Sequence, residues 1–228
     1  MKTAVVIGAT GLVGRELVKR LADSSQYAQV LAICRQQQSW PSSQVRTLVF
    51  DFQNWQDLEV QIKNLCSMNE THCFCALGTT IRQAGSKEAF KKVDLVYPVL
   101  FAKLAARVGA EKLLVVSAMG ALAESKVFYN QVKGQMEAEV SKVFNRQLAF
   151  CRPSLLLGNR QQFRFGEKIA EIIYWPFSPI IHLVFKKYQP IQANQVALAM
   201  QKIAESRIEK NVYDNLEMIQ ISEKNKTS

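Results

Sequence analysis

Short apolar runs alternate with longer segments of helical periodicity along most of the chain. The apolar runs predict β-strands at residues 3–7, 30–33, 47–50, 73–77, 113–117 and 148–151. Most of these runs are unbroken by polar residues, as expected of strands that are buried on both faces in a parallel sheet. The pattern therefore favours a sheet that is covered on two sides.

Between the predicted strands, apolar residues recur at intervals of three and four. This spacing predicts amphipathic helices at residues 13–22, 55–65, 87–108 and 126–144, and a last helix at 194–206. Strand and helix alternate along the chain, which is typical of a doubly wound α/β fold with a parallel sheet, the Rossmann fold.

The rhythm changes after Arg152 and Pro153. Aromatic and apolar residues crowd residues 163–188 before the last helix. We therefore predict a single Rossmann domain over residues 1–228, with residues 153–192 inserted in it as a small C-terminal substrate lobe. Part of the insertion is apolar enough to raise the question of a membrane, but an acidic residue and two prolines interrupt it, so no transmembrane segment is predicted.

The first turn of the predicted fold carries three glycines at three-residue intervals, in the stretch VVIGATGLVG, with Thr10 inside the turn. After a strand and before a helix, glycines permit a tight turn and let backbone N–H groups approach a pyrophosphate at the positive end of the helix dipole. Gly8, Gly11 and Gly14 therefore predict a dinucleotide site. The simpler alternative is a sharp strand-to-helix turn without a ligand.

The end of the second predicted strand bears on the choice of cofactor. An acidic residue there would accept hydrogen bonds from a ribose 2′-hydroxyl, whereas a basic residue would neutralise a 2′-phosphate. The chain has Cys34 and Arg35 at this place, with no acidic residue beside them in the sequence. This favours NADP(H) over NAD(H), the alternative being a solvated arginine in a loop. Gly78, after the fourth strand, either leaves room for the cofactor or simply forms a turn.

The candidate chemistry lies in residues 115–140. Ser117 ends a predicted strand, and Tyr129 and Lys133 are four residues apart, which places both on one face of a helix. Reduction of a carbonyl needs a proton at oxygen, and a lysine cation would lower the pKa of the tyrosine that donates it. Ser117 would hold the substrate oxygen and Lys133 the nicotinamide ribose. Alternatively, the tyrosine packs and the lysine lies along the surface; Ser125 is better explained as a helix cap.

Charge and composition narrow the classes of protein further. The 228 residues carry a formal net charge of +10, which attracts anions of any kind. The lysines are scattered over helix faces, so nucleic-acid binding is not expected. Five cysteines without a Cys-x-x-Cys pair, and only two histidines, predict reduced cysteines and no metal site. Because the first residues lack the features of a secretory signal, we predict a cytoplasmic protein.

These motifs resemble the short-chain dehydrogenase/reductase superfamily, and specifically its atypical branch, over roughly residues 1–155. The stretches CALGTTIRQAG, VDLVY, QVKGQMEAEV and CRPSLLLGNRQ are similar to the Tat-interacting protein family of NADPH-binding oxidoreductases. The resemblance implies a Rossmann fold and an active site of Ser117, Tyr129 and Lys133. The contacts that it implies for NADP(H) are Gly8, Thr10, Gly11, Leu12, Val13, Gly14, Arg35, Asp51, Phe52, Leu77, Gly78, Thr79, Lys133 and Pro153.

Two places qualify the resemblance. Asp51 and Phe52 would frame the adenine, but Asp51 taken alone suits the cap of the helix that begins near residue 55. Many members of the superfamily have an active-site asparagine in the fourth helix, whereas this chain has KVDLVYP, with Asp94 and Tyr97. A proton relay through such an asparagine is therefore not expected.

Together these features predict an NADP(H)-dependent oxidoreductase that reduces or oxidises a carbonyl, hydroxyl or related unsaturated group. Aromatic residues in the substrate lobe favour a small, largely apolar substrate, although the same residues suit a core. The alternative is an NADP(H)-sensing regulatory protein that binds a protein partner, because a fold does not fix a function. A sugar-nucleotide epimerase or dehydratase is less favoured because the C-terminal region is short.

Overall fold

The apolar runs form the strands of one parallel sheet in the computed structural model, which describes residues 2–66, 70–158 and 188–224. The strand order is β3-β2-β1-β4-β5-β6-β9. The strands are β1 (Lys2–Ile7), β2 (Tyr27–Cys34), β3 (Val45–Val49), β4 (Thr71–Cys75), β5 (Lys112–Val116), β6 (Gln147–Arg152) and β9 (Val212–Asp214). All six predicted strands are confirmed within a few residues. Within this sheet, as far as the structure describes it, β9, a three-residue edge strand, was not predicted.

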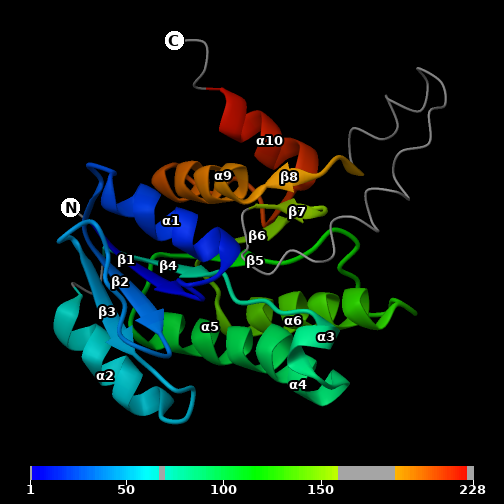
Figure 1. Ribbon diagram of the computed structural model, residues 1–228, viewed down its shortest axis with the longest axis horizontal. Coiled ribbons are helices and arrows are strands. Elements are labelled where there is room, and N and C mark those ends of the chain that lie inside the picture. Colours follow the sequence, from blue (N-terminus) through cyan, green and yellow to red (C-terminus); the bar gives the residue numbers. More distant parts are fainter. Residues whose placement is uncertain (1, 67–69, 159–187, 225–228) are drawn as a thin grey trace.

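The helices lie in two layers, one on each face of the sheet (Figure 1). One layer holds α1 (Leu12–Ala22), α9 (Ala193–Glu205) and α10 (Asn215–Glu223). The other holds α2 (Trp55–Leu65), α5 (Tyr97–Arg107) and α6 (Phe128–Val143), with the short α3 (Ile81–Ala84) and α4 (Lys87–Lys91) beside them. This arrangement confirms the predicted doubly wound α/β fold.

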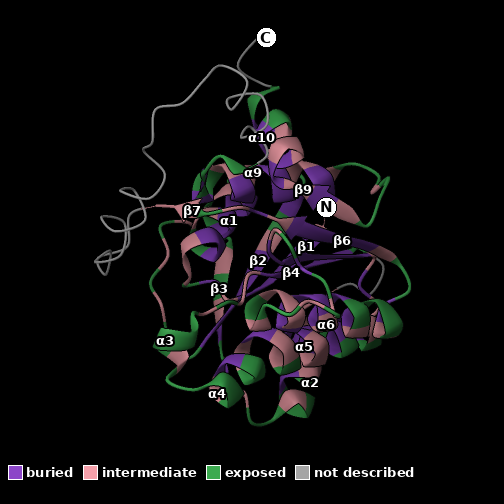
Figure 2. Cartoon of the chain, turned by 90° about the vertical axis from the view of Figure 1, so that its right-hand side faces the viewer, coloured by how far each residue is buried: buried purple, intermediate pink, exposed green. Residues whose placement is uncertain are grey.

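Each helical layer shares its own hydrophobic core with the sheet, because successive side chains of a strand point to opposite faces. In β1, Val6 belongs to the core that contains Met200 of α9, whereas Val5 belongs to the core that contains Phe101 of α5. Figure 2 shows the central strands largely buried and the outer helix faces exposed, whereas the edge strand β3 is mostly exposed or half-buried. The central strands β4 and β5 are buried along their whole length, as the unbroken apolar runs indicated.

The predicted helix at residues 87–108 is divided in three. Between α4 and α5 lies a π-helical turn, η1 (Lys92–Val96). Pro98 stands in the first turn of α5 and has no N–H to donate to the carbonyl of residue 94, so a regular α-helix cannot run through this point. The widened turn holds Asp94, which is fully buried. π-Helical turns of this kind are frequent at functional sites.

The strand order places a crevice at the carboxyl ends of β1 and β4. The chain runs outward from β1 through β2 to β3 and then returns to β4 on the other side of β1. Loops that follow β1 and β4 therefore diverge into opposite layers, which is where open α/β sheets bind ligands. The loops that end β2, β3, β5 and β6 reach the same edge.

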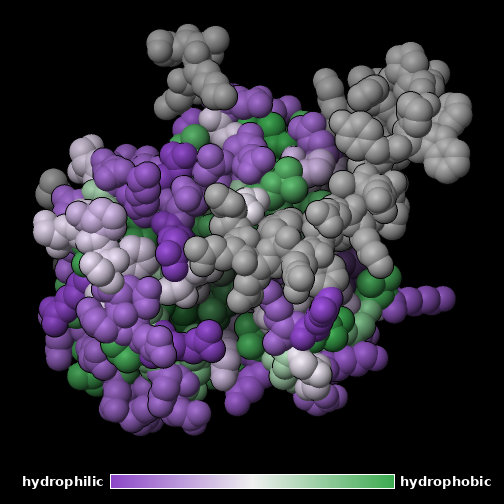
Figure 3. Space-filling view, viewed as in Figure 1, coloured by the Kyte–Doolittle hydropathy of each residue, from purple (hydrophilic) through white to green (hydrophobic). Residues whose placement is uncertain are grey.

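Most of the predicted substrate lobe, residues 159–187, lies outside the described residues, so the lobe and its place in a single domain stay predictions. On either side of it, β7 (Leu156–Leu157) pairs with β8 (Ile191–Gln192). The described helices include none that is long and apolar enough to cross a bilayer. The face shown in Figure 3 is largely hydrophilic, with hydrophobic residues in small groups.

Tyr27 and His72 form a buried polar pair at the amino-terminal edge of the sheet. The Tyr27 hydroxyl lies 2.9 Å from His72 Nδ1. His72 is fully buried, and this burial lowers its pKa to about 3. The unfolded chain, with an ordinary histidine pKa of about 6.5, takes up a proton between these two values that the folded chain does not.

We therefore expect the free energy of unfolding to fall as the pH drops from about 6.5 toward 3, by up to about 1.4 kcal/mol per pH unit from His72 alone. His72→Gln keeps a polar partner for Tyr27 but does not titrate. Urea unfolding of both proteins at pH 7 and pH 5 measures the difference. Equal losses of stability in the two proteins would contradict this assignment.

Candidate active site

The glycine turn between β1 and α1 is closed tightly on itself. Gly11 N donates a hydrogen bond to the Gly8 carbonyl oxygen at 2.9 Å. A Cβ at Gly14 would lie 2.1 Å from that same oxygen, so no other residue fits there without moving the turn. Gly11 caps α1 without a side chain, and the first turn, all of it described, contains no acidic residue. The N-terminus of α1 is therefore suited to receive an anion.

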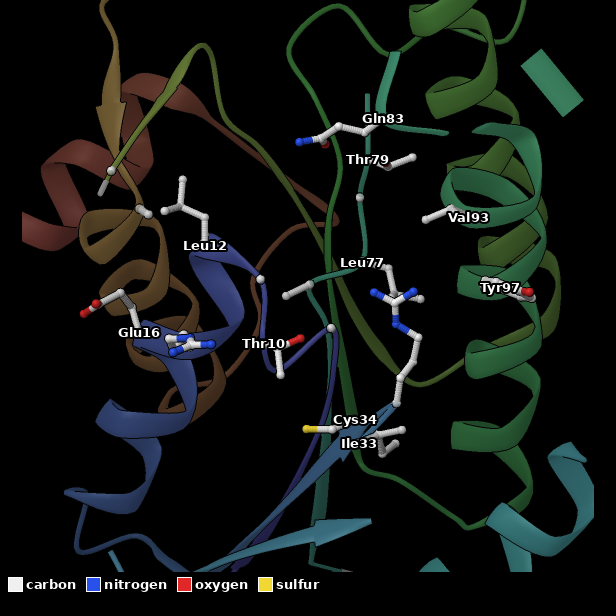
Figure 4. A pocket seen from close by; sticks show the side chains of 18 of the residues that line it. Thr10, Leu12, Glu16, Ile33, Cys34, Leu77, Thr79, Gln83, Val93 and Tyr97 are labelled. Carbon is white, nitrogen blue, oxygen red and sulfur yellow. The ribbon is translucent and has the colours of Figure 1, made fainter. Parts of the chain in front are cut away.

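A cavity with a volume of about 1380 Å³ opens in front of this turn. Figure 4 shows it between the start of α1, with Thr10 and Leu12, and the layer of η1 and α5, which carries Val93 and Tyr97. Leu77 and Thr79, from the segment after β4, lie between the two sides. Such a cavity exceeds the usual range for small ligands and has room for a dinucleotide.

Most of the residues predicted to contact the cofactor line this cavity. They are Gly8, Thr10, Gly11, Leu12, Arg35, Asp51, Phe52, Leu77, Gly78 and Thr79. Four predicted contacts do not line it: Val13, Gly14, Lys133 and Pro153. Val13 and Gly14 are buried in the packing of α1, because a helix turns these positions away from the cavity. Lys133 and Pro153 lie beyond it, toward α6 and β6.

The structure also brings charged residues to the cavity that the sequence argument did not consider. Arg15 lines it together with Arg35. The Arg15 charge acts to lower the pKa of the Cys34 thiol, although burial raises that pKa overall. Glu16, on α1, lines the cavity as well. The position of Arg15, directly after the third glycine, was the available signal.

Aromatic residues form the wall of the cavity beyond β3. Phe52 has a positive φ of 67°, which is uncommon for a residue with a side chain. Its ring stacks on Tyr97 with centroids 4.4 Å apart. Asp51 Oδ1 accepts a hydrogen bond from Gln53 N, whereas the cap of α2 is Asn54. The capping alternative for Asp51 is therefore wrong.

Ser117 lies directly after β5, at the carboxyl edge of the sheet. Its backbone N–H donates to the Cys151 carbonyl oxygen at 2.8 Å, which fixes it beside β6. The residue is only 3% exposed, and its Oγ has no hydrogen-bond partner within the described part of the chain. A buried hydroxyl without a partner is costly, which makes Ser117 a candidate for contact with a ligand.

Tyr129 and Lys133 stand one turn apart on α6. Lys133 is buried, and its Nζ lies 2.7 Å from Asp94 Oδ1 of the π-helical turn. Tyr129 is 36% exposed and packs on Phe90. The pKa of Tyr129 is raised, because burial and the Asp94 charge together outweigh the opposite effect of Lys133. The sequence argument expected the lysine to lower this pKa, and it did not include the aspartate.

The loop between β5 and α6 holds these residues in place. A Cβ at Gly134 would lie 2.2 Å from the backbone of Leu122 and Ala123, so this glycine lets the loop pack against α6. Met119 N donates to the Pro153 carbonyl oxygen at 2.9 Å, which ties the loop to the end of β6. The N-cap position of α6 is Val127 and not Ser125, which lies just before it and whose Oγ accepts a hydrogen bond from Val127 N at 3.1 Å.

Comparison with known proteins agrees with this geometry. The profile of a family described as NAD(P)H-binding matches residues 8–154. Protein FMP52 of Debaryomyces hansenii is 34% identical over 198 residues, which cover 86% of this chain and 84% of that protein. Protein HTATIP2 of Rattus norvegicus is 31% identical over 177 residues, 74% of this chain and 69% of that protein.

Solved structures show the same fold at low sequence identity. The UDP-Glc/GlcNAc 4-epimerase of Campylobacter jejuni has a TM-score of 0.66 and 8% identity, and the match covers 98% of this chain and 83% of that one. The human epimerase family protein SDR39U1, solved with NADPH, has a TM-score of 0.57 and 15% identity, with 94% and 77% covered. At these identities the likeness concerns the fold alone.

The relatives overturn one prediction and confirm another. The predicted cytoplasmic location is wrong, since FMP52 proteins of several yeasts, among them Debaryomyces hansenii and Candida albicans, are named as mitochondrial. The predicted family is confirmed by the matched profile and by the two groups of relatives. The chain therefore belongs to the NAD(P)H-binding family that includes the FMP52 and HTATIP2 proteins, within the atypical short-chain dehydrogenases/reductases.

Proposed function

We propose that the protein is an NADP(H)-dependent oxidoreductase that acts on a carbonyl, or on the corresponding hydroxyl, of a small and largely apolar molecule. The observation that carries the proposal is the buried Ser117 hydroxyl, which has no partner within the described residues and which a substrate oxygen would satisfy. A protein that only senses the cofactor would have no use for a serine hydroxyl, a tyrosine and a buried lysine acting together on a substrate oxygen.

The cavity fits a dinucleotide from the turn outward. The N-terminus of α1 would hold the pyrophosphate, and the stacked rings of Phe52 and Tyr97 would form a wall beside the adenine. Arg35, with Arg15, would neutralise the 2′-phosphate that distinguishes NADP(H) from NAD(H). When bound, the reduced cofactor supplies the hydride for the reaction.

The catalytic side chains would act on the substrate oxygen. Ser117 would donate a hydrogen bond to the carbonyl oxygen and orient it, and the Tyr129 hydroxyl would donate the proton that the oxygen gains on reduction. Asp94 Oδ1, which pairs with Lys133, lies close to Gly78, because a Cβ at Gly78 would be 3.6 Å from this oxygen. Lys133 is therefore buried next to the segment Gly78–Thr79. From there it would bind the ribose hydroxyls.

Arg35→Ala tests the cofactor assignment. We expect NADPH affinity to fall about tenfold to a hundredfold, because a charge-assisted contact to the 2′-phosphate is lost, while NADH affinity changes little. Arg15→Ala should act in the same direction. Fluorescence titration of each purified variant with both nucleotides measures the effect.

The matched control for this experiment is Arg207→Ala. Arg207 is exposed beyond the end of α9, where the Ser206 carbonyl oxygen accepts a hydrogen bond from Lys112 at the start of β5. Arg207 therefore carries the same charge as Arg35 but lies at the amino-terminal edge of the sheet, opposite the edge that carries the cavity. Equal losses for NADPH and NADH in Arg35→Ala would overturn the preference for NADP(H). Tight NADPH binding without reduction of any carbonyl would favour a regulatory protein.

A further inference from the structure

Asp94 and Lys133 form an ion pair that is almost completely removed from solvent. The side chains are 1% and 3% exposed, and Lys133 Nζ lies 2.7 Å from Asp94 Oδ1. A buried carboxylate is stable only where it is paired and hydrogen-bonded. The aspartate therefore compensates the positive charge that Lys133 would otherwise present to Tyr129.

The second oxygen of Asp94 holds the segment that follows β4. Thr79 N donates a hydrogen bond to Asp94 Oδ2 at 2.9 Å. Thr79 and its neighbour Gly78 both line the cavity assigned to the cofactor. One carboxylate thus joins three elements: the cofactor segment, the π-helical turn and the helix that carries Tyr129.

Few charged groups face Tyr129 across these elements. Lys133 lies on the same helix, and Asp94 comes from the π-helical turn. From α4, the uncharged ring of Phe90 packs on Tyr129, while Lys87 and Lys91 stand over the ring of the neighbouring Phe128. Beneath the ion pair, Cys75 of β4 is fully buried, and burial raises its pKa to about 12, so it stays a neutral thiol. The charge at Tyr129 is therefore set by the aspartate and the lysine.

We propose that Asp94 is a positioning residue of this active site, which neutralises Lys133, keeps Tyr129 protonated and ties the cofactor segment to α6. The inference rests on the proposed function. A protonated tyrosine is the form that reduction uses: the carbonyl carbon gains a hydride from the bound reduced cofactor, the oxygen gains the Tyr129 proton, and the phenolate then takes a proton from water. The site is in this way set for reduction rather than for oxidation.

The test is a pH titration of Tyr129 in the whole folded protein, in which the absorbance of tyrosinate measures the ionised fraction. The chain has six tyrosines, so the signal of Tyr129 is the difference between a protein and its Tyr129→Phe counterpart. In the native sequence we expect a midpoint above the ordinary value of about 10. Asp94→Asn keeps an oxygen for Thr79 N but removes the charge, and we expect its midpoint to fall by about one pH unit or more.

Two controls separate the charge from other effects. Asp23→Asn removes the same charge from an exposed residue at the end of α1 and should leave the midpoint unchanged. Asp94→Ala also removes the acceptor of Thr79 N, and we expect NADPH affinity to fall more in this variant than in Asp94→Asn.

An unchanged or higher midpoint in Asp94→Asn would overturn the inference. If that variant does not fold, a native midpoint well below about 10 overturns it equally. Neither measurement depends on the cofactor or on the substrate. Failure of the native protein to bind NADPH would instead count against the proposed function, so the two failures are distinguishable.

Discussion

Tyr129→Phe is expected to reduce the rate of carbonyl reduction by about a hundredfold to ten-thousandfold, which is the usual contribution of a positioned proton donor. The phenylalanine keeps the ring that packs on Phe90, with centroids 5.6 Å apart, and loses only the hydroxyl. Tyr129 does not line the cavity assigned to the cofactor. We therefore expect the fold and NADPH affinity to be retained while turnover is lost.

The measurement is the oxidation of NADPH by the purified protein with a panel of apolar aldehydes and ketones. Tyr213→Phe is the matched control, because Tyr213 lies on the edge strand β9, where Lys210 stands over its ring. This control should keep native turnover. Native rates in Tyr129→Phe, with a carbonyl that the native protein reduces, would show that another group donates the proton.

The parts of the site that follow single strands could be predicted from the sequence. Gly8, Arg35 and Gly78 each stand directly after an apolar run, and a parallel sheet brings the carboxyl ends of its strands to one edge. All three line the cavity. Local patterns and the binding of ligands at this edge of parallel sheets are enough to place these three residues.

The parts that depend on contacts between distant elements could not be predicted in the same way. Asp94 is one aspartate within a helical pattern, and the chain gives no local sign that it pairs with Lys133 on another helix. The lysine lowers the pKa of Tyr129 as expected, but burial of the tyrosine, together with the Asp94 charge, raises that pKa overall. The π-helical turn that aims Asp94 inward also depends on packing, although Pro98 was a partial signal.

Lys133→Met should lower the free energy of unfolding by about 3–5 kcal/mol, measured by urea unfolding without cofactor. Methionine fills much of the space of lysine, so the main loss is electrostatic. The Asp94 carboxylate would keep its hydrogen bond from Thr79 N but would have no counter-ion while only 1% exposed. A buried charge left alone in this way is strongly destabilising, whereas the whole pair adds little to stability over well-packed apolar residues.

The control and the double variant separate this effect from the simple loss of a salt bridge. Lys142→Met removes an equivalent pair with Glu139 at 2.6 Å, but those side chains are 68% and 47% exposed, so we expect a loss below about 1 kcal/mol. Asp94→Asn combined with Lys133→Met removes both charges, and it should be more stable than Lys133→Met alone. If Lys133→Met lost no more stability than Lys142→Met, the buried pair would not be formed in solution. If the double variant recovers free energy of unfolding, removing both charges costs less than removing one. The pair would then be kept for its action on Tyr129 and the cofactor segment rather than for stability.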